Sequence, residues 1–416
     1  MANRVSTIVI ATIAFVSATA SIRGQSPSGN EWSQWRGPHR DGQVVGATWP
    51  TDLSEQHLSE KWSVPLGPSY SGPIVSQDRV FVTETKDDKF EVVRALDRQT
   101  GKQIWETQWE GSMKVPFFAS ANGSWIRATP AFDGERLYVA GMKDVLVCLD
   151  ASTGDILWKR DFVADTSSPL PQFGFASSPL IHGDHIYVQA GASFAKLETL
   201  TGNIVWQTLK DEGGMNGSAF SSPVFATIAG VPQLVVQTRT NLAGVSPEDG
   251  AVLWSQEITA FRGMNILTPT VIGDRIFTSS YGGRSTLLTV SHEGTSWTVT
   301  EAWNHKSQGY MSSPVVIDGH IYLHLRNQRL VCLDATTGEE RWTTKPFGKY
   351  WSMMANGDKL LALDESGKLM LIQSSADEFR LIDQTTVGDN AWAHVAIVNN
   401  EIFVRDLREL KAFVWQ

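Results

Sequence analysis

The sequence predicts an all-β protein, an eight-bladed β-propeller of four-stranded antiparallel blades whose last blade is closed by an N-terminal strand. Three observations carry this prediction. A phrase ending in tryptophan recurs along the chain, a second phrase built around a proline precedes it in most units, and no segment shows helical periodicity. Four short strands in each repeat of roughly 40 to 50 residues are the pattern of propeller blades.

The first phrase has the form Leu-Asp-x-x-Thr-Gly-x-x-x-Trp, and its clearest copies end at Trp105, Trp158 and Trp342. A strand ends at the Leu-Asp pair, a turn follows at Thr-Gly, and the next strand carries the tryptophan. Because one large flat ring recurs at a fixed position in the outer strand, we expect these rings to pack between blades rather than to bind a ligand. The tryptophans of this structural girdle are Trp62, Trp105, Trp158, Trp206, Trp254, Trp303 and Trp342.

The second phrase is clearest from Ser177 to Val188 and from Ser312 to Leu323, and related segments begin at Pro130, Pro223 and Pro269. It reads as a short strand, a tight turn at Gly and Asp, and a second alternating strand. Each unit therefore contains four strands, named a to d from the axis outward. Strand a lines the axis, and strand d carries the tryptophan.

The number of blades follows from how the ring closes. Seven units run from Ser71 to about Leu381, and three further strands follow at 393–398, 401–405 and 410–415. The fourth strand of this last unit is available at the other end of the chain, at 58–64. An N-terminal strand in that place would hide a sheet edge. We therefore predict eight blades, with seven as the alternative.

The Thr-Gly-x-x-x-Trp phrase resembles the PQQ-type (quinoprotein) propeller repeat, and the resemblance covers essentially all of residues 58–416. The chain length and single ring are also similar to those of the BamB family of outer-membrane assembly scaffolds, although the lipid-bearing cysteine of that family is absent. The segment from Trp32 to Gly42 resembles a leader of bacterial secreted PQQ-like propellers of unassigned role. In the quinoprotein family, the repeated tryptophans form a docking girdle.

Residues 1–20 have the pattern of a secretory signal peptide. Arg4 precedes an apolar run from Val5 to Val16 that is too short to span a bilayer comfortably, and small residues end at Ala20. We expect cleavage near Ala20 and a monomeric periplasmic or secreted protein with no membrane span and no lipid anchor. The expected divisions are 1–20 for the signal peptide, 21–57 for a leader segment and 58–416 for a single propeller domain.

Composition narrows the function classes. The 416 residues carry 44 acidic and 35 basic side chains, a formal net charge of -9, which disfavours nucleic-acid binding because phosphate needs cationic partners. Two cysteines are too few for a disulfide scaffold or an iron–sulfur cluster. Since Cys148 and Cys332 fall in opposite blades, we expect two buried free thiols.

Two further patterns are expected to be structural. Asp97, Asp150 and Asp334 each precede a Thr-Gly turn, where a carboxylate accepts backbone N–H bonds, so we do not expect them to be catalytic. His182 and His185 have metal-ligand spacing but lie on the a–b turn, and we interpret them as turn residues. We predict no metal site and no catalytic residue.

The candidate binding surface is the face that the d–a and b–c loops share, because non-repeating loops on a rigid scaffold usually carry function. Aromatic residues precede most a strands and cations lie in the b–c loops, a combination that suits a planar or anionic ligand or a protein partner. The candidate aromatics are Tyr70, Trp125, Phe175, Phe220, Tyr310, Trp351 and Trp392, and the candidate cations are Arg239, Arg284, Arg326 and Arg405. Further candidates for the face are Asn241, Arg262, Asn265, Gln308, Asn327 and Arg408, while Trp109, Phe117 and Phe118 form a candidate docking ridge. The alternatives are that these aromatics cap the core and that the cations form a solvated rim.

Three function classes remain, and we favour the first. It is a non-enzymatic scaffold that binds a protein partner or a cell-envelope polymer, because no catalytic constellation stands out from the repeats. The second, which the resemblance implies, is a PQQ-dependent alcohol or sugar dehydrogenase with calcium. Such enzymes carry an adjacent cysteine pair, and this chain has none. The third is a polysaccharide-active enzyme, for which no paired carboxylates are recognisable. We therefore predict no cofactor.

Overall fold

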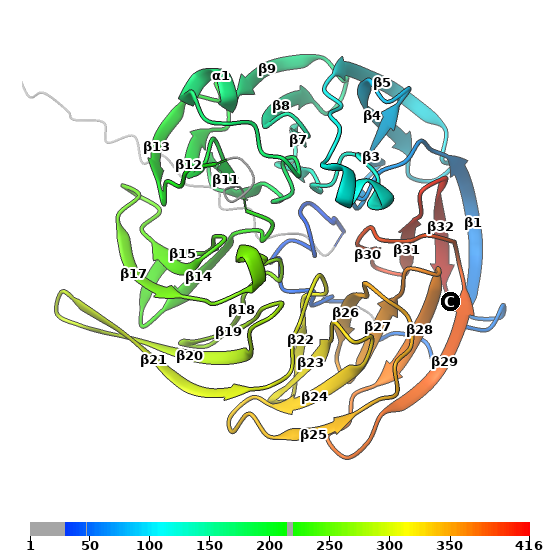
Figure 1. Cartoon of the computed structure of the whole chain (residues 1–416). Helices are drawn as coiled ribbons and strands as arrows, with labels where there is room; N and C mark the ends of the chain where they lie inside the picture. The colour runs from blue at the N-terminus through cyan, green and yellow to red at the C-terminus, as the bar shows by residue number, and fades with distance from the viewer. Residues whose placement is uncertain (1–29, 47, 214–218) are drawn as a thin grey trace, which may run out of the picture.

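The computed structural model describes residues 30–46, 48–213 and 219–416 and contains eight four-stranded antiparallel sheets arranged in a ring (Figure 1). The eight-bladed prediction is confirmed, and the seven-bladed alternative is wrong. The predicted signal peptide and the first part of the leader, to residue 29, lie outside the described residues.

Each blade runs from strand a at the axis to strand d at the rim. Blades 1 to 4 are β2 (74–75), β3 (79–86), β4 (90–97) and β5 (103–110); β6 (131–132), β7 (136–141), β8 (145–150) and β9 (156–161); β10 (180–182), β11 (185–190), β12 (193–198) and β13 (204–208); β14 (224–228), β15 (231–237), β16 (241–245) and β17 (252–257). Blades 5 to 8 are β18 (270–272), β19 (275–279), β20 (285–293) and β21 (296–305); β22 (315–317), β23 (320–324), β24 (330–334) and β25 (340–343); β26 (352–356), β27 (359–363), β28 (368–373) and β29 (380–386); β30 (396–398), β31 (401–405), β32 (409–415) and β1 (58–65).

In the described ranges, three short helical segments interrupt this pattern, the α-helix α1 (162–166) and the 3-10 helices η1 (117–122) and η2 (261–263). All three lie in d–a loops. No helix in the described part of the chain is long and apolar enough to cross a membrane.

The eighth blade joins the two ends of the described chain. Strand β1 pairs antiparallel with β32, from Leu58 opposite Trp415 to Pro65 opposite Glu409. The N-terminal strand therefore covers the outer edge of β32, which would otherwise present unpaired backbone groups. This confirms the predicted closure, and Figure 1 shows blue β1 beside red β32 at the rim.

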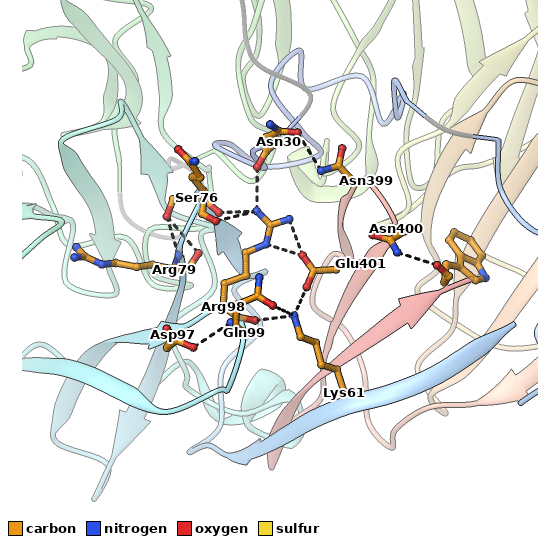
Figure 2. A network of polar contacts seen from close by, with 12 residues as sticks. Asn30, Lys61, Ser76, Arg79, Asp97, Arg98, Gln99, Asn399, Asn400 and Glu401 are labelled. Carbon is orange, nitrogen blue, oxygen red and sulfur yellow. Dashed lines mark hydrogen bonds and ion pairs between the residues drawn. The ribbon is translucent and has the colours of Figure 1, made fainter. Parts of the chain in front are cut away.

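A polar cluster holds the seam between blades 8 and 1 (Figure 2). The Glu401 carboxylate accepts from Lys61 at 2.6 Å and from two guanidinium nitrogens of Arg98, at 2.7 and 2.6 Å. Arg98 also donates to the carbonyls of Ser76 at 2.9 Å and Asn30 at 3.1 Å. The cluster therefore ties the last blade, the first blade and the leader together around one buried carboxylate.

The repeated Thr-Gly and Trp positions meet across each blade boundary. Trp105 donates its indole N–H to the carbonyl of Ala151 in the next blade at 3.1 Å. Gly154 of that blade lies against the ring at positive φ, and a Cβ there would approach the indole to 2.6 Å, so only glycine fits. The same arrangement joins Trp62 to Arg98 and Gly101, Trp158 to Thr199 and Gly202, Trp206 to Glu248 and Gly250, and Trp303 to Ala335 and Gly338.

The other two girdle tryptophans differ in their partners. Trp254 donates to the Gln233 side chain in its own blade at 2.6 Å, and Trp342 donates to the Ser375 carbonyl of blade 7 at 2.9 Å. In all eight blades, the pairing of strand c with strand d shifts register beside this position. Such a bulge bends the outer strand and aims its side chains.

A second set of inter-blade bonds lies at the axis, where a Ser or Thr hydroxyl directly before several strand-a prolines accepts from the preceding blade. Thr129 N donates to Ser178 Oγ at 3.0 Å, Ser178 N to Ser222 Oγ at 2.9 Å, and Ser222 N to Thr268 Oγ1 at 3.0 Å. Gly72 N donates to Thr129 Oγ1 at 3.0 Å in the same manner. This explains why Ser or Thr precedes proline in so many units.

The leader runs inside the ring, where Figure 1 shows it in dark blue. Trp32 exchanges backbone bonds with Val75 of blade 1, and Val44 N donates to Ala355 O of blade 7 at 2.8 Å. Strands a face the axis with an unpaired edge, so the leader satisfies backbone groups that would otherwise be exposed there.

Two arginines anchor the leader deeper in the ring. Arg36 donates to the Pro314 carbonyl at 2.6 Å, and Arg40 donates to the carbonyls of Pro179 at 2.6 Å and Ser178 at 3.0 Å. Both guanidinium groups are buried, and burial lowers the pKa of Arg36 to about 10 and that of Arg40 to about 9. The leader thus enters from the side of the a–b turns, and a cavity of about 660 Å³ remains between it and blades 3 to 5.

The residues interpreted as structural have the expected environments. Asp97, Asp150 and Asp334 accept backbone N–H bonds of 2.7 to 3.1 Å from their turns. Turn hydroxyls and then these backbone bonds lower the pKa values of Asp97 and Asp150, and the backbone bonds lower that of Asp334. Cys148 and Cys332 are buried and free in blades 2 and 6, which confirms that prediction. Burial raises the pKa of each thiol to about 12.

Candidate functional site

The d–a and b–c loops share one face of the ring, which we call the open face. The opposite face carries the a–b turns and the leader, and we call it the leader face. On the open face, the non-repeating loops bring aromatic side chains from different blades into contact. The candidate site is therefore built by the parts of the chain that the repeat does not dictate.

A continuous arc of aromatic rings crosses the open face from blade 1 to blade 5. Its neighbouring centroids are 4.1 to 6.2 Å apart, within the range for favourable ring pairs. Tyr70 stacks on Trp392 at 4.7 Å with an interplanar angle of 20°. In order, the arc consists of Trp125, Tyr70, Trp392, Tyr350, Tyr310, Tyr281 and Phe261, none of which is fully buried.

A second aromatic group lies over blades 1 to 4. Phe117 and Phe118 of η1 are 88% and 56% exposed, and Phe118 contacts Phe173 at 6.2 Å. Phe173 in turn contacts Phe220, which lies under the guanidinium of Arg239 at 4.8 Å. Trp109, expected in the same ridge, instead lies in β5, is buried and donates to Glu91 at 2.8 Å. The ridge is therefore made by the two phenylalanines.

The candidate cations divide by exposure. Arg284 and Arg326 are exposed in the b–c loops of blades 5 and 6, and the Arg326 guanidinium lies 4.3 Å over the ring of Tyr281. Arg239 is buried and donates to the Arg262 carbonyl at 2.7 Å. Arg405 is also buried, and its guanidinium donates to the Thr83 carbonyl and, at 2.7 Å, to that of Gly67.

Two candidate aromatics lie below the accessible surface. Phe175 is 2% exposed and packs on Phe162, and Trp351 is 1% exposed and stacks on His324 at 4.7 Å. Both fill the junction between neighbouring blades. The surface available to a ligand therefore includes Tyr70, Trp125, Phe220, Tyr310 and Trp392 of the candidate aromatics.

The sequence interpretation missed several residues of the open face. Tyr281 and Tyr350 link the arc, and Phe173 and Phe261 extend the aromatic groups. Tyr350 directly precedes Trp351, so the adjacent aromatic pair was a signal that one ring faces the core and the other faces outward. The φ of Tyr350 is 55°, a left-handed conformation that turns its ring toward Trp392.

Burial also sets the ionisation of groups on this face. It raises the pKa of Tyr70 to about 12 and raises that of Tyr310, so both phenols remain protonated donors at neutral pH. It lowers the pKa of His324 to about 4, which keeps that imidazole neutral. The positive charge of the face therefore comes from Arg and Lys side chains.

The described residues do not fit the quinone site that the repeat implies. No group of three His, Cys, Asp or Glu side chains in the described part of the chain is placed to hold a metal ion. His182 stacks on Phe225 at 3.6 Å rather than pairing with His185. The two thiols lie in blades 2 and 6 and are buried, so they provide no adjacent cysteine pair.

Comparisons with known proteins agree on one family. A family model described as outer membrane protein assembly factor BamB matches residues 42–121 and 88–344. BamB of Yersinia pestis is 24% identical over 358 residues, covering 82% of this chain and 84% of that protein. The crystal structure of BamB from Moraxella catarrhalis has a TM-score of 0.62 at 15% identity, covering 86% of this chain and 98% of that one.

A dehydrogenase is also among the similar structures. A europium-containing methanol dehydrogenase has a TM-score of 0.56 at 12% identity, covering 93% of this chain and 98% of that one. At this identity, the likeness extends to the propeller fold and not to the chemistry.

Proposed function

The chain belongs to the family of the outer membrane protein assembly factor BamB, and on that premise we propose that it is a non-enzymatic scaffold propeller that binds a protein partner on its open face. The observation that carries the proposal is the arc of seven contacting aromatic rings across that face. Half-exposed tyrosine and tryptophan side chains are the residues that most often anchor protein interfaces.

The Phe117–Phe118 ridge supports the same surface. Two adjacent phenylalanines that are 88% and 56% exposed leave a large apolar area in water. Contiguous exposed apolar surface on a soluble domain favours a partner that covers it. The ridge and the arc meet on the same face, so one partner can contact both.

We also propose that the protein acts outside the cytoplasm, without a bound cofactor. The signal-peptide pattern of residues 1–20 supports this location, as does the outer-membrane role named for the BamB relatives. The poor fit of the described residues to a quinone and metal site supports a binding function rather than dehydrogenase chemistry.

Site-specific photo-crosslinking in the producing cells tests the proposal. The photoreactive amino acid p-benzoylphenylalanine replaces Phe117 or Trp125 on the open face, or Leu157 on the outer strand β9 as a control. Leu157 is 49% exposed, so accessibility alone does not distinguish it. We expect one discrete crosslinked species from the two open-face positions and none from Leu157. Equal crosslinking at all three positions, or none at the open face, would contradict the proposal.

A second measurement tests the dehydrogenase alternative. The purified mature protein is titrated with PQQ and Ca²⁺ while tryptophan fluorescence is followed, and reduction of an artificial electron acceptor is then measured with alcohols and sugars. We expect no dye reduction. Saturable quenching accompanied by turnover would replace the scaffold proposal with the enzyme.

A further inference from the structure

The positive charge of the open face is concentrated over blades 4 to 7. The six consecutive loops on this face between β15 and β26 contain eight Lys or Arg residues and no Asp or Glu. We call them the basic sector. The loops are 238–240, 258–269, 280–284, 306–314, 325–329 and 344–351, and the cations are Arg239, Arg262, Arg284, Lys306, Arg326, Arg329, Lys345 and Lys349.

The basic sector is positively charged, although the whole chain has a formal net charge of -9. Six of the eight cations are exposed, all except Arg239 and Arg329. Among the ion pairs of the described residues, one involves these six side chains, that of Lys349 with Glu365 at 3.1 Å. A surface with so little internal neutralisation attracts a partner of negative charge.

A cavity of about 250 Å³ opens in the middle of the basic sector, between blades 5, 6 and 7. Three tyrosines of the arc, Tyr281, Tyr310 and Tyr350, form its walls, and Arg326 and Lys349 lie at its edge. Ser312 and the neutral imidazole of His324 lie deeper, with Nδ1 of the imidazole 3.3 Å from the serine hydroxyl. The cavity therefore offers cations and hydroxyl groups inside an aromatic wall.

The loops that line this cavity are tied to one another, so its shape is present before any ligand arrives. Arg326 N donates to Gln308 O at 2.9 Å, and Phe347 N donates to Gln328 O at 2.7 Å. The Tyr350 ring is held by Trp392 at a centroid distance of 4.1 Å. A preformed site avoids the entropic cost of ordering loops on binding.

We propose that this cavity binds a carboxylate side chain from an Asp- or Glu-rich segment of the protein partner. Arg326 offers a planar donor fork that matches a carboxylate. Lys349 adds N–H donors while sharing its charge with Glu365 at 3.1 Å, and the tyrosine walls shield one side of the site from water. The volume accommodates one acidic side chain, so the surrounding cations would contact further acids of the same segment. The inference rests on the proposed function, because it assigns the chemistry of the partner on the open face.

Peptide binding to the full mature protein tests the inference. The probe is a fluorescein-labelled octapeptide of alternating Glu and Gly, and the comparison peptide has Gln in place of every Glu. We expect the Glu peptide to bind with measurable anisotropy change and the Gln peptide to bind at least tenfold more weakly. Equal binding of the two peptides would overturn the inference.

Paired variants locate the site. The double variant Arg326→Gln/Lys349→Gln removes the two cations at the cavity, and Lys114→Gln/Lys143→Gln removes two exposed cations from the other half of the same face. We expect the first to weaken the Glu peptide at least tenfold and the second to change it less than twofold, with the unfolding temperature unchanged in both. Equal weakening in the two doubles would indicate general charge attraction and would overturn the cavity as the site.

Two further comparisons distinguish a carboxylate site from a general anion site, and failure of this inference from failure of the proposed function. Inorganic phosphate at 10 mM is added as a competitor, and we expect it to leave binding of the Glu peptide within twofold. Complete displacement would show a general anion site and overturn the assignment to a carboxylate. Absence of peptide binding together with crosslinking at Phe117 and Trp125 would overturn this inference alone, whereas peptide binding without crosslinking would count against the proposed function.

Discussion

The two faces of the ring differ in how they use the same kinds of side chain. On the leader face, Trp32 and Arg40 are buried and bound to carbonyls or packed against the blades. On the open face, Trp125 and Arg326 remain accessible and contact other rings. Aromatic and arginine residues thus stabilise the ring on one side and present a surface on the other. Residue type alone therefore does not separate structural from functional side chains in this protein.

The largest effect is expected from Trp32→Ala on the leader face. Trp32 is 3% exposed and belongs to the apolar cluster around blades 7, 8 and 1. Loss of a buried tryptophan leaves a cavity and lowers the free energy of unfolding by about 4 kcal/mol. Chemical denaturation measures this change in the free energy of unfolding. The matched control is Trp125→Ala on the open face, where we expect a loss below about 1 kcal/mol. Similar losses in the two variants would remove the distinction between the faces.

The next effect concerns the seam, where Glu401→Gln removes the charge that Lys61 and Arg98 share. The Arg98 side chain is only 6% exposed, so it would be left as an uncompensated buried cation. We expect a loss of about 3 kcal/mol in the free energy of unfolding. Glu110→Gln is the control, because its ion pair with Lys89 has the same short distance, 2.7 Å, but is exposed. Glu110→Gln should leave the free energy of unfolding nearly unchanged, because water and salt screen an exposed ion pair. Equal costs would show that the seam is not held by its buried charge.

A pH-dependent effect is expected at His394, which lies beside the leader and packs edge-on against Trp35 at 5.0 Å. Burial, with a smaller contribution from Arg36, lowers the pKa of His394 to about 3. The unfolded chain, with a pKa of about 6.5, then binds the proton more readily, so stability falls as the pH drops below that value. Between pH 7.5 and pH 5, the wild type should lose about 2 kcal/mol more than His394→Asn. Parallel denaturation curves for the two proteins would contradict this.

The smallest effect on stability is expected from Phe117→Ser at the tip of the ridge. The side chain is 88% exposed, so the free energy of unfolding should change by less than about 0.5 kcal/mol. Binding to the crosslinked partner should nevertheless weaken at least fivefold in a pull-down with purified components. A large loss of stability would show that the ridge belongs to the framework and not to the binding surface.

The repeats explain why so much of the fold was predictable. Trp105 and Gly154 recur because each blade boundary needs the same contact, and a pattern that returns several times is readable without a structure. The eighth blade was predictable because three strands remained after seven units, and a fourth was available at the N-terminus.

The leader and the open face were harder to predict because each of their contacts occurs once. Nothing in the sequence around Arg40 indicates that its guanidinium binds carbonyls of blade 3. Trp351 and Trp392 both come shortly before a strand a, yet Trp351 is buried against His324 and Trp392 stacks on Tyr70. The packing of neighbouring loops determines whether each ring is buried or accessible, and that packing depends on the tertiary structure.

The closure of the eighth blade has a consequence for the order of folding. The hydroxyl of Ser63 donates to the carboxylate of Glu409 at 2.7 Å, although 346 positions separate them in sequence. Strand β1, which is synthesised early, can pair only after β32, one of the last strands, has been made, and contacts of such long range form slowly. Until then, both strands expose edges that can pair with other chains. The incomplete ring is therefore the form of the protein most exposed to aggregation, until its C-terminal strands pair with the N-terminal strand.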